Sequence, residues 1–152
     1  MTQSLLATFG AYGGSFLVAL IAGLFPIVSI EIFLLALSGF GGQTFGTLFV
    51  CCLLATVGHQ IAKTITYYAG VGALERGRMK AKIEANRERI DRWNKAPHLI
   101  LVLSGTLGIP PMYLVGIIAD PLMRIRFVPF TLIVFFTRLG RFVVLAAIPQ
   151  LL

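Results

Sequence analysis

The stretch Gly14–Phe40, GSFLVALIAGLFPIVSIEIFLLALSGF, places one carboxylate, Glu31, inside an otherwise uncharged and mainly apolar run. An ionised carboxylate is costly to hold in hydrocarbon, so an acid in such a run is usually neutral, paired or turned toward a water-filled cavity. Pro26 removes a backbone donor shortly before it and predicts a helix break near Phe25–Ser29. The stretch therefore combines a helix break with a candidate functional acid.

The two flanks of this break are too short to cross a bilayer. Each has about 11 or 12 residues, or roughly 17 Å of helix, against a hydrocarbon core of about 30 Å. We therefore expect residues 14–40 to form a re-entrant hairpin that enters and leaves the membrane on one side. Such a backbone is tolerated where protein or a water-filled cavity surrounds it. The alternative is one kinked spanning helix with Glu31 near its end.

The composition is that of an integral membrane protein. Of the 152 residues, 57% are hydrophobic and 12% are charged, and the mean hydropathy is +0.89, which leaves too little polar surface for a soluble domain. No Pro/Gly/Ser-rich linker divides the chain, so we expect one membrane domain over residues 1–152. The N-terminal residues lack the basic region of a secretory signal and are expected in the mature chain.

The net charge of +7 is concentrated in one segment. Most of the 13 basic residues fall between residues 76 and 95: Arg76, Arg78, Lys80, Lys82, Arg87, Arg89, Arg92 and Lys95. A short basic segment between apolar ones is typical of the positive-inside bias, so we expect this loop to be cytoplasmic rather than a nucleic-acid site.

Apolar residues recur at helical spacing along the same segment: Met79, Ile83, Ile90 and Trp93. This narrow stripe predicts an amphipathic helix over residues 74–95 that lies on the membrane surface, with its basic side toward anionic headgroups. The alternative is a charged face that is simply solvated.

Residues 44–70 are long enough to form the first complete span. His59 and Lys63 lie four apart in it and share one helical face. Inside a membrane, such a face is expected to turn toward protein or water. The alternative for Lys63 is to extend toward the cytoplasmic headgroups.

Residues 98–119, HLILVLSGTLGIPPMYLVGIIA, repeat the opening pattern. Short apolar flanks lie on either side of a break at Gly108, Pro110 and Pro111. Because neither flank can span, we predict a second re-entrant hairpin over residues 98–119.

Residues 127–148 form the second predicted span and carry Arg138 and Arg141, three apart on one face. If the basic loop is cytoplasmic, the first hairpin enters from outside and the second from the cytoplasm. The two halves, each a hairpin followed by a span, then have opposite orientations. This is the inverted-repeat plan of secondary transporters, in which broken helices meet near the midplane.

Short motifs along nearly the whole chain, residues 14–148, resemble the DedA family, also called the VTT or SNARE-associated domain family. The resemblance rests on the order of these motifs: FPIVSIE at 25–31, YYAGVG at 67–72, GIPPMY at 108–113, Arg124, Phe127 and TRLGRF at 137–142. Two departures indicate a divergent or minimal member. Lys63 stands where the family often has a second acid, and Gly105–Leu107 stand where it often has arginines.

The resemblance implies a polytopic protein of the bacterial inner membrane, with two facing re-entrant helices, that acts as a lipid transporter, flippase or scramblase. Bacterial members are linked to recycling of the undecaprenyl phosphate carrier, to phospholipid distribution and to dependence on the proton-motive force. The position of Lys63 weighs against proton coupling through a pair of carboxylates.

Our hypothesis for the site is a polar cavity between the hairpin tips that accepts a phosphate-bearing lipid head. Glu31 would bind and release a proton, and the arginines would pair with phosphate through their fixed fork of donors. The expected substrate-binding residues are Ser29, His59, Lys63, Tyr113, Arg138 and Arg141, and the expected breaks are Pro26, Gly108, Pro110 and Pro111. The alternative role for Glu31 is a structural ion pair with Arg138, Arg141 or Lys63.

Two other function classes are less well supported. An enzyme acting on a lipid phosphate is disfavoured, because the chain has no HExxH, no cluster of paired carboxylates and no glycine-flanked nucleophile. We therefore expect no catalytic residue, metal or cofactor. A membrane scaffold whose basic helix recruits a partner is the other alternative. The expected partners are phosphate-bearing lipids and further copies of the chain, because one copy has little perimeter to shield polar tips.

Overall fold

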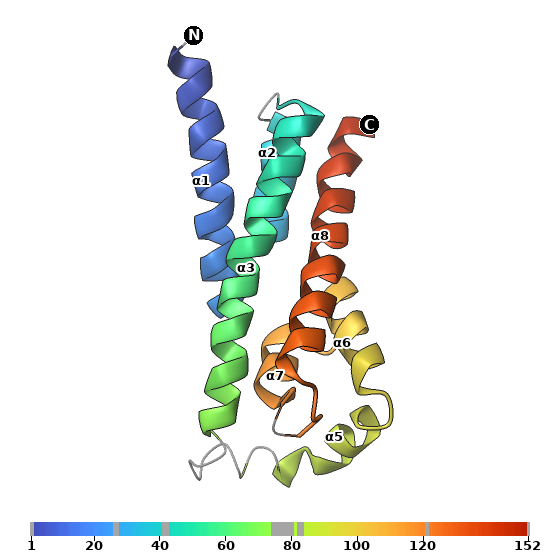
Figure 1. Ribbon diagram of the computed structural model, residues 1–152. Coiled ribbons are helices and arrows are strands. Elements are labelled where there is room, and N and C mark those ends of the chain that lie inside the picture. The colour runs from blue at the N-terminus through green and yellow to red at the C-terminus, as the bar shows by residue number, and fades with distance from the viewer. Residues whose placement is uncertain are drawn as a thin grey trace. The chain divides into compact units, whose positions relative to one another are not determined.

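The computed structural model describes residues 2–25, 28–40, 43–73, 81, 84–120 and 122–151, and these residues form seven α-helices and no strand (Figure 1). The helices are α1 Thr2–Leu24, α2 Ile30–Phe40, α3 Phe45–Ala73, α5 Arg87–Trp93, α6 Pro97–Thr106, α7 Met112–Ile118 and α8 Phe127–Leu151. The predicted all-helical fold is confirmed for this part of the chain.

Two of the described helices are long and apolar enough to cross a membrane, by length and composition. They are a 26-residue segment of α3, Phe45–Gly70, and a 23-residue segment of α8, Phe127–Pro149. At 1.5 Å per residue they measure about 39 and 35 Å, more than the roughly 30 Å of a hydrocarbon core. They coincide with the predicted spans at 44–70 and 127–148.

The first arm of the predicted hairpin is longer than the sequence indicated. Helix α1 has 23 residues and begins at Thr2, whereas the predicted arm begins at Gly14. The predicted flank length of about 11 or 12 residues is therefore wrong for α1, which measures about 35 Å against a hydrocarbon core of about 30 Å. No proline precedes Pro26, so nothing in the sequence interrupts the backbone hydrogen bonds of the early residues. Helix α2, with 11 residues, has the predicted length of about 16 Å. Pro26 itself lies outside the described residues.

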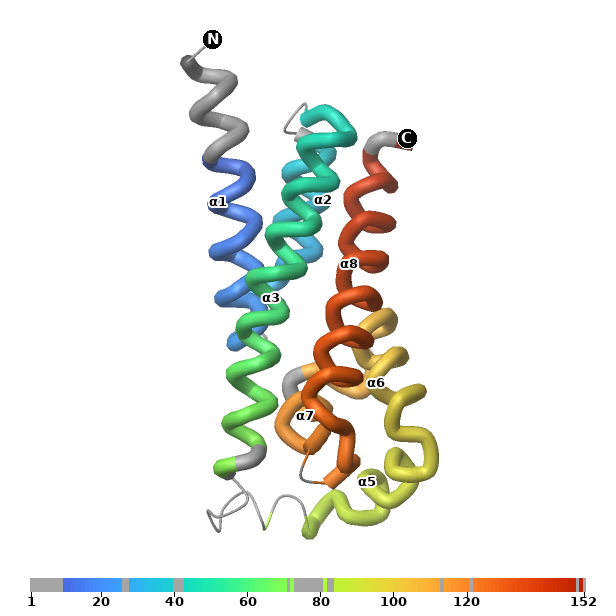
Figure 2. Tube along the Cα trace, viewed as in Figure 1, coloured from blue at the N-terminus to red at the C-terminus, as the bar shows by residue number. Residues whose placement is uncertain are grey.

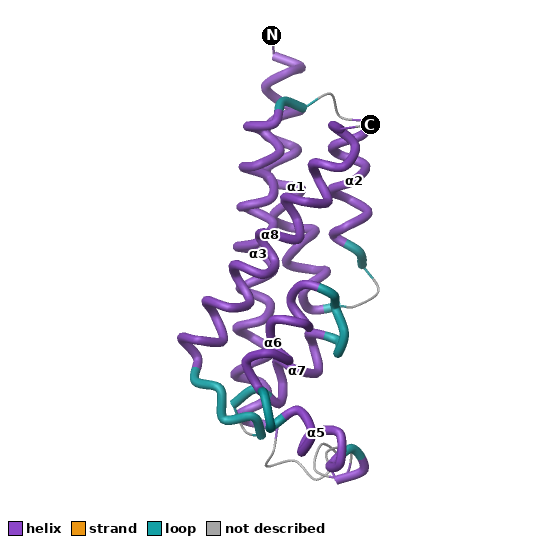
Figure 3. Tube along the Cα trace, turned by 90° about the vertical axis from the view of Figure 1, so that its right-hand side faces the viewer, coloured by secondary structure: helices purple, strands orange, loops and turns teal. Residues whose placement is uncertain are grey.

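The chain divides into two compact units, and the divisions fall inside α3 and α8. The first unit contains residues 1–62 and 138–152. In it, α1 and α2 pack against each other (Figure 3). Buried apolar side chains join them to the first part of α3 and the last part of α8, and they form this core: Ala19, Ile30, Leu34, Cys52, Ala55, Phe142 and Ala146.

Two close contacts hold the helices of the first unit together. Gly58 of α3 faces the backbone of α1, where an added Cβ would collide with the carbonyl oxygen of Phe16. Ser38 of α2 donates a 2.6 Å hydrogen bond to the carbonyl oxygen of Ala146 in α8. The contact at Gly58 requires a residue without a side chain. The hydrogen bond from Ser38 links α2 directly to α8.

The second unit, residues 63–137, is built around the ring of Tyr67. The ring centroid lies 4.9 Å from that of Phe130 and 5.5 Å from that of Phe127. The Tyr67 hydroxyl donates a 2.9 Å hydrogen bond to the buried carbonyl oxygen of Ile125. These contacts attach the last part of α3 to the start of α8.

Helices α6 and α7 pack against each other in the second unit, and the chain turns between them (Figure 2). Gly108 lies in this turn with a φ of 79°, a value that favours glycine. Ser104 donates a 2.6 Å hydrogen bond to the carbonyl oxygen of Pro110. The predicted break thus lies between two short helices of 10 and 7 residues.

Only part of the predicted amphipathic helix at 74–95 falls within the described residues, since 74–80 and 82–83 lie outside them. The described part contains α5, Arg87–Trp93. Its apolar residue Ile90 is buried in the core of the second unit, and Trp93 packs against the same core.

Candidate functional site

Glu31 lies in the first turn of α2 and pairs with two arginines of α8. Its Oε1 atom is 3.6 Å from Nη1 of Arg138 and 3.3 Å from Nη2 of Arg141. Both arginines can reach one oxygen because residues three apart share a helix face. All three residues belong to the first compact unit. The structural pairing considered for Glu31 is thus present with both arginines.

Ser29 holds the other carboxylate oxygen of Glu31. Its hydroxyl donates to Oε2 at 3.1 Å and accepts the backbone N–H of Ile32 at 3.4 Å. Ser29 directly precedes α2 and so caps its N-terminus, a position that serine favours. A carboxylate in the first turn is further stabilised by the positive end of the helix dipole. These local interactions of the sequence Ser29–Glu31 hold the carboxylate of Glu31 at the N-terminus of α2.

The three charged side chains differ in their exposure. The side chain of Arg138 is 8% exposed, whereas those of Glu31 and Arg141 are 25% and 26% exposed. The buried Nε of Arg138 has no hydrogen-bond partner within the described part of the chain. A buried cation is tolerated when a counter-charge accompanies it. Arg138 is therefore the inner member of the cluster, and Glu31 and Arg141 form its accessible side.

The cluster carries more positive than negative charge. Arginine stays protonated in proteins, so two guanidinium groups face a single carboxylate. A planar guanidinium matches the geometry of carboxylate and phosphate oxygens. The accessible side of this cluster can therefore accept a further anionic group.

Two other predicted site residues lie on α3. His59 is buried in the first unit, where its ring meets that of Phe142 edge-on at a centroid distance of 6.1 Å. Lys63, one turn further along, is also buried and belongs to the second unit. Both polar side chains are thus buried, as expected for this face of the predicted span.

The remaining predicted residues lie in the second unit or outside the described residues. Gly108, Pro110 and Pro111 form the turn between α6 and α7 in the second unit. Pro26 and the side chain of Tyr113 lie outside the described residues. Of the residues predicted for the site, the structure brings together Ser29, Glu31, Arg138 and Arg141. Among the residues it describes, no group of three His, Cys, Asp or Glu side chains could hold a metal ion.

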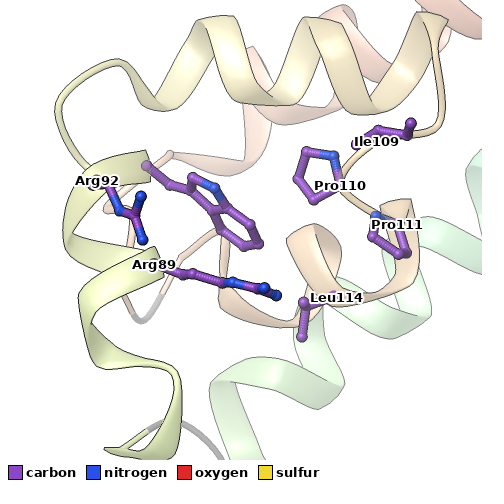
Figure 4. Close-up of a pocket in the computed structure, with 7 residues that line it drawn as sticks. Arg89, Arg92, Ile109, Pro110, Pro111 and Leu114 are labelled. Atoms are coloured by element: carbon purple, nitrogen blue, oxygen red, sulfur yellow. The ribbon is translucent and has the colours of Figure 1, made fainter.

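The sequence did not predict a pocket of about 400 Å³ in the second unit, between α5 and the turn that leads into α7 (Figure 4). Its two walls come from segments that are separated in the sequence, so no pattern of residue spacing within one segment predicts that they meet. The apolar residue Ile90 was the available signal, because it anchors α5 on the core of this unit.

The fold and the cluster define a class of protein in physical terms. The described chain is all-helical, two of its helices are long and apolar enough to cross a membrane, and a carboxylate on one helix pairs with two arginines on another. Comparisons of the chain with protein-family models, with curated proteins and with solved structures give no match.

Proposed function

We propose that this chain is a DedA-like membrane protein that moves a phosphate-bearing lipid across the bilayer, as a transporter or scramblase. The observation that carries the proposal is the sharing of one carboxylate oxygen of Glu31 by Arg138 and Arg141. The surplus positive charge suits an anionic headgroup, and arginine suits phosphate in particular. The order of the motifs described above supports the family.

The surroundings of the cluster fit an amphiphilic substrate. Ile32 of α2, next to Glu31, and Val144 of α8, three positions after Arg141, are large apolar side chains that are exposed. Exposed apolar side chains beside a charged site suit a ligand whose head is anionic and whose tails stay in hydrocarbon. A free inorganic anion would make no use of them.

In the proposed cycle, the lipid phosphate competes with Glu31 for the guanidinium groups. A headgroup enters from the accessible side, contacts Arg141 first and then displaces the carboxylate from Arg138. Protonation of Glu31 removes its negative charge and so weakens its hold on both arginines. Proton uptake by Glu31 thereby favours lipid binding, and proton release favours the closed ion pair. This exchange would couple the proton gradient to lipid movement.

The proposal treats residues 14–40, which contain the last part of α1 and all of α2, and residues 98–119, which contain α7 and most of α6, as re-entrant hairpins, and α3 and α8 as the spans, in two inverted halves. In support, α2, α6 and α7 have 11, 10 and 7 residues, and all are shorter than a hydrocarbon core. The membrane is proposed to be the bacterial inner membrane, with the basic loop 74–95 on its cytoplasmic side. The length of α1 places its N-terminal part outside the hydrocarbon in this arrangement.

The function is tested with the purified protein in proteoliposomes. A fluorescent phospholipid or polyprenyl phosphate is compared with an uncharged fluorescent glycolipid that crosses the bilayer slowly without protein. We expect the protein to accelerate movement of the phosphate-bearing lipid and to leave the glycolipid unaffected. Equal acceleration of both, or of neither, would contradict the proposal.

The same samples distinguish the competing function classes. The lipid is recovered after the assay and analysed by mass spectrometry. A transporter returns it chemically unchanged, whereas conversion of the lipid would identify an enzyme. A scaffold would move no lipid and would retain a protein partner through residues 76–95.

A further inference from the structure

The pocket in the second unit takes no part in the proposed function. One wall is formed by α5 and the other by the turn before α7 together with α7 itself (Figure 4). Arg89, Arg92 and Trp93 line it from α5, and Ile109, Pro110 and Leu114 line it from the opposite wall. The pocket thus sets two cations and an indole against an apolar surface.

Helix α5 is held in place by its apolar side. Ile90 is buried in the core of the second unit, and Trp93 packs against that core. Arg89 and Arg92, three apart, share another face of the same helix. In Figure 4, Arg89 extends from α5 toward Leu114 of α7. The core therefore fixes which face of α5, the one that carries these two arginines, lies along the pocket.

None of the residues described as lining the pocket carries a negative charge. The acidic residues of α5, Glu88 and Asp91, are not among the residues that line the pocket. Nε of Arg92 donates a 3.4 Å bond to a backbone carbonyl of its own helix. Within the described part of the chain, neither Arg89 nor Arg92 forms an ion pair. The pocket is therefore suited to an anionic group.

The opposite wall is apolar and continues onto an exposed turn. Ile109 is 75% exposed and Leu107 is 67% exposed, although both are large hydrophobic residues. Exposed apolar side chains of this kind suit contact with acyl chains. An indole prefers the boundary between hydrocarbon and headgroups. The two arginines, the indole and the apolar turn therefore match, in this order, the phosphate, the glycerol and the acyl chain of a phospholipid.

We propose that this pocket binds the head of an anionic phospholipid, with its phosphate between Arg89 and Arg92. The glycerol region rests on Trp93, and the first acyl carbons lie along Ile109 and Pro110. This is a second lipid site, built within the second unit, and it does not depend on lipid movement by the Glu31 cluster. It would retain anionic lipid beside the turn between α6 and α7.

Trp93 is the single tryptophan of the chain and therefore reports on this site alone. The protein is placed in nanodiscs that contain brominated phosphatidylglycerol or, at equal mole fraction, brominated phosphatidylcholine. Bromine quenches indole fluorescence at short range. We expect stronger quenching of Trp93 by the anionic lipid.

Substitution of both Arg89→Gln and Arg92→Gln should weaken this lipid preference about tenfold, since each basic residue near a membrane surface contributes to binding of anionic lipid. The matched control is Arg87→Gln with Lys95→Gln. It removes the same charge from the same segment, both residues are exposed, and neither lines the pocket. The control should keep the preference.

Three results would overturn the proposal. The first is equal quenching of the wild-type protein by the two lipids, which needs no variant. The second is an equal loss of preference in the control pair, which would indicate general surface charge. The third is loss of the preference in excess inorganic phosphate, which would indicate a site for free anions. None of these results depends on whether the Glu31 cluster moves lipid, because nanodiscs report binding only.

Discussion

Oε1 of Glu31 lies 3.6 Å from Nη1 of Arg138, and the arginine of this ion pair is three times less exposed than the carboxylate, at 8% against 25%. The buried cation therefore depends on a partner that the surroundings can reach. A carboxylate in that position is open to replacement by another anion. This asymmetry is the physical basis of the exchange proposed above.

Glu31→Gln should destabilise the protein without unfolding it, because it leaves Arg138 as a buried charge without a counter-charge. Breaking a fully buried ion pair costs about 3–5 kcal/mol. We expect a lower cost here, about 2 kcal/mol, because Glu31 is partly exposed. Denaturant unfolding in detergent measures the change. Glu88→Gln, at an exposed position of α5, is the control and should change stability by less than about 0.5 kcal/mol.

Arg141→Gln should weaken binding of a phosphate-bearing lipid about tenfold, since it removes charge-assisted hydrogen bonds from the accessible side of the cluster. The measurement is the rise in melting temperature that a phospholipid or polyprenyl phosphate produces. Arg126→Gln, at an exposed position outside the cluster, should retain the full rise. Equal protection of both variants would remove Arg141 from the site.

Gly58→Ala should destabilise the first unit by about 1–3 kcal/mol, because the new methyl group would collide with the backbone of α1 at Phe16. Gly46→Ala is the matched control on the same helix. A Cβ at Gly46 would meet no atom within 4 Å, so this change should be neutral or raise stability by at most about 1 kcal/mol. Melting temperatures of the two variants check the difference, and equal effects would argue against a close crossing of α1 and α3.

Tyr67→Phe should destabilise the second unit by about 1–3 kcal/mol, because the buried carbonyl oxygen of Ile125 would lose its 2.9 Å hydrogen bond. The adjacent Tyr68 is 56% exposed, so Tyr68→Phe is a control with the same chemical change. Unfolding in denaturant compares the two. An equally small effect at both positions would contradict the structural role of the Tyr67 hydroxyl.

Local sequence patterns predicted much of the fold for physical reasons. The two helices that are long and apolar enough to cross a membrane were predictable, because long apolar runs favour a helix in hydrocarbon. The turn at Gly108 and Pro110 was predictable because proline removes a donor and glycine permits a positive φ. The start of α1 at Thr2 was not, because residues 2–13 carry no signal that distinguishes an interfacial segment from the beginning of a helix.

The candidate site was predictable in its members but not in its geometry. Glu31, Arg138 and Arg141 stood out because charges are rare in apolar runs. Spacing placed the two arginines on one face, but it did not show that both meet the same carboxylate oxygen. The helix packing that brings α2 to α8 depends on distant contacts such as the bond from Ser38 to Ala146. The role of Ser29 as a cap follows from the local sequence and could have been derived from it.

The proposed exchange at Glu31 is tested by the rate at which proteoliposomes containing Glu31→Gln move a phosphate-bearing lipid. Three other proteins are measured beside it at equal protein density and at two pH values. They are the wild type, the double variant Arg138→Gln with Arg141→Gln, and the single variant Arg126→Gln. The account predicts that Glu31→Gln and the double arginine variant lose lipid movement while Arg126→Gln retains it. Movement by Glu31→Gln at the wild-type rate, independent of pH, would contradict it.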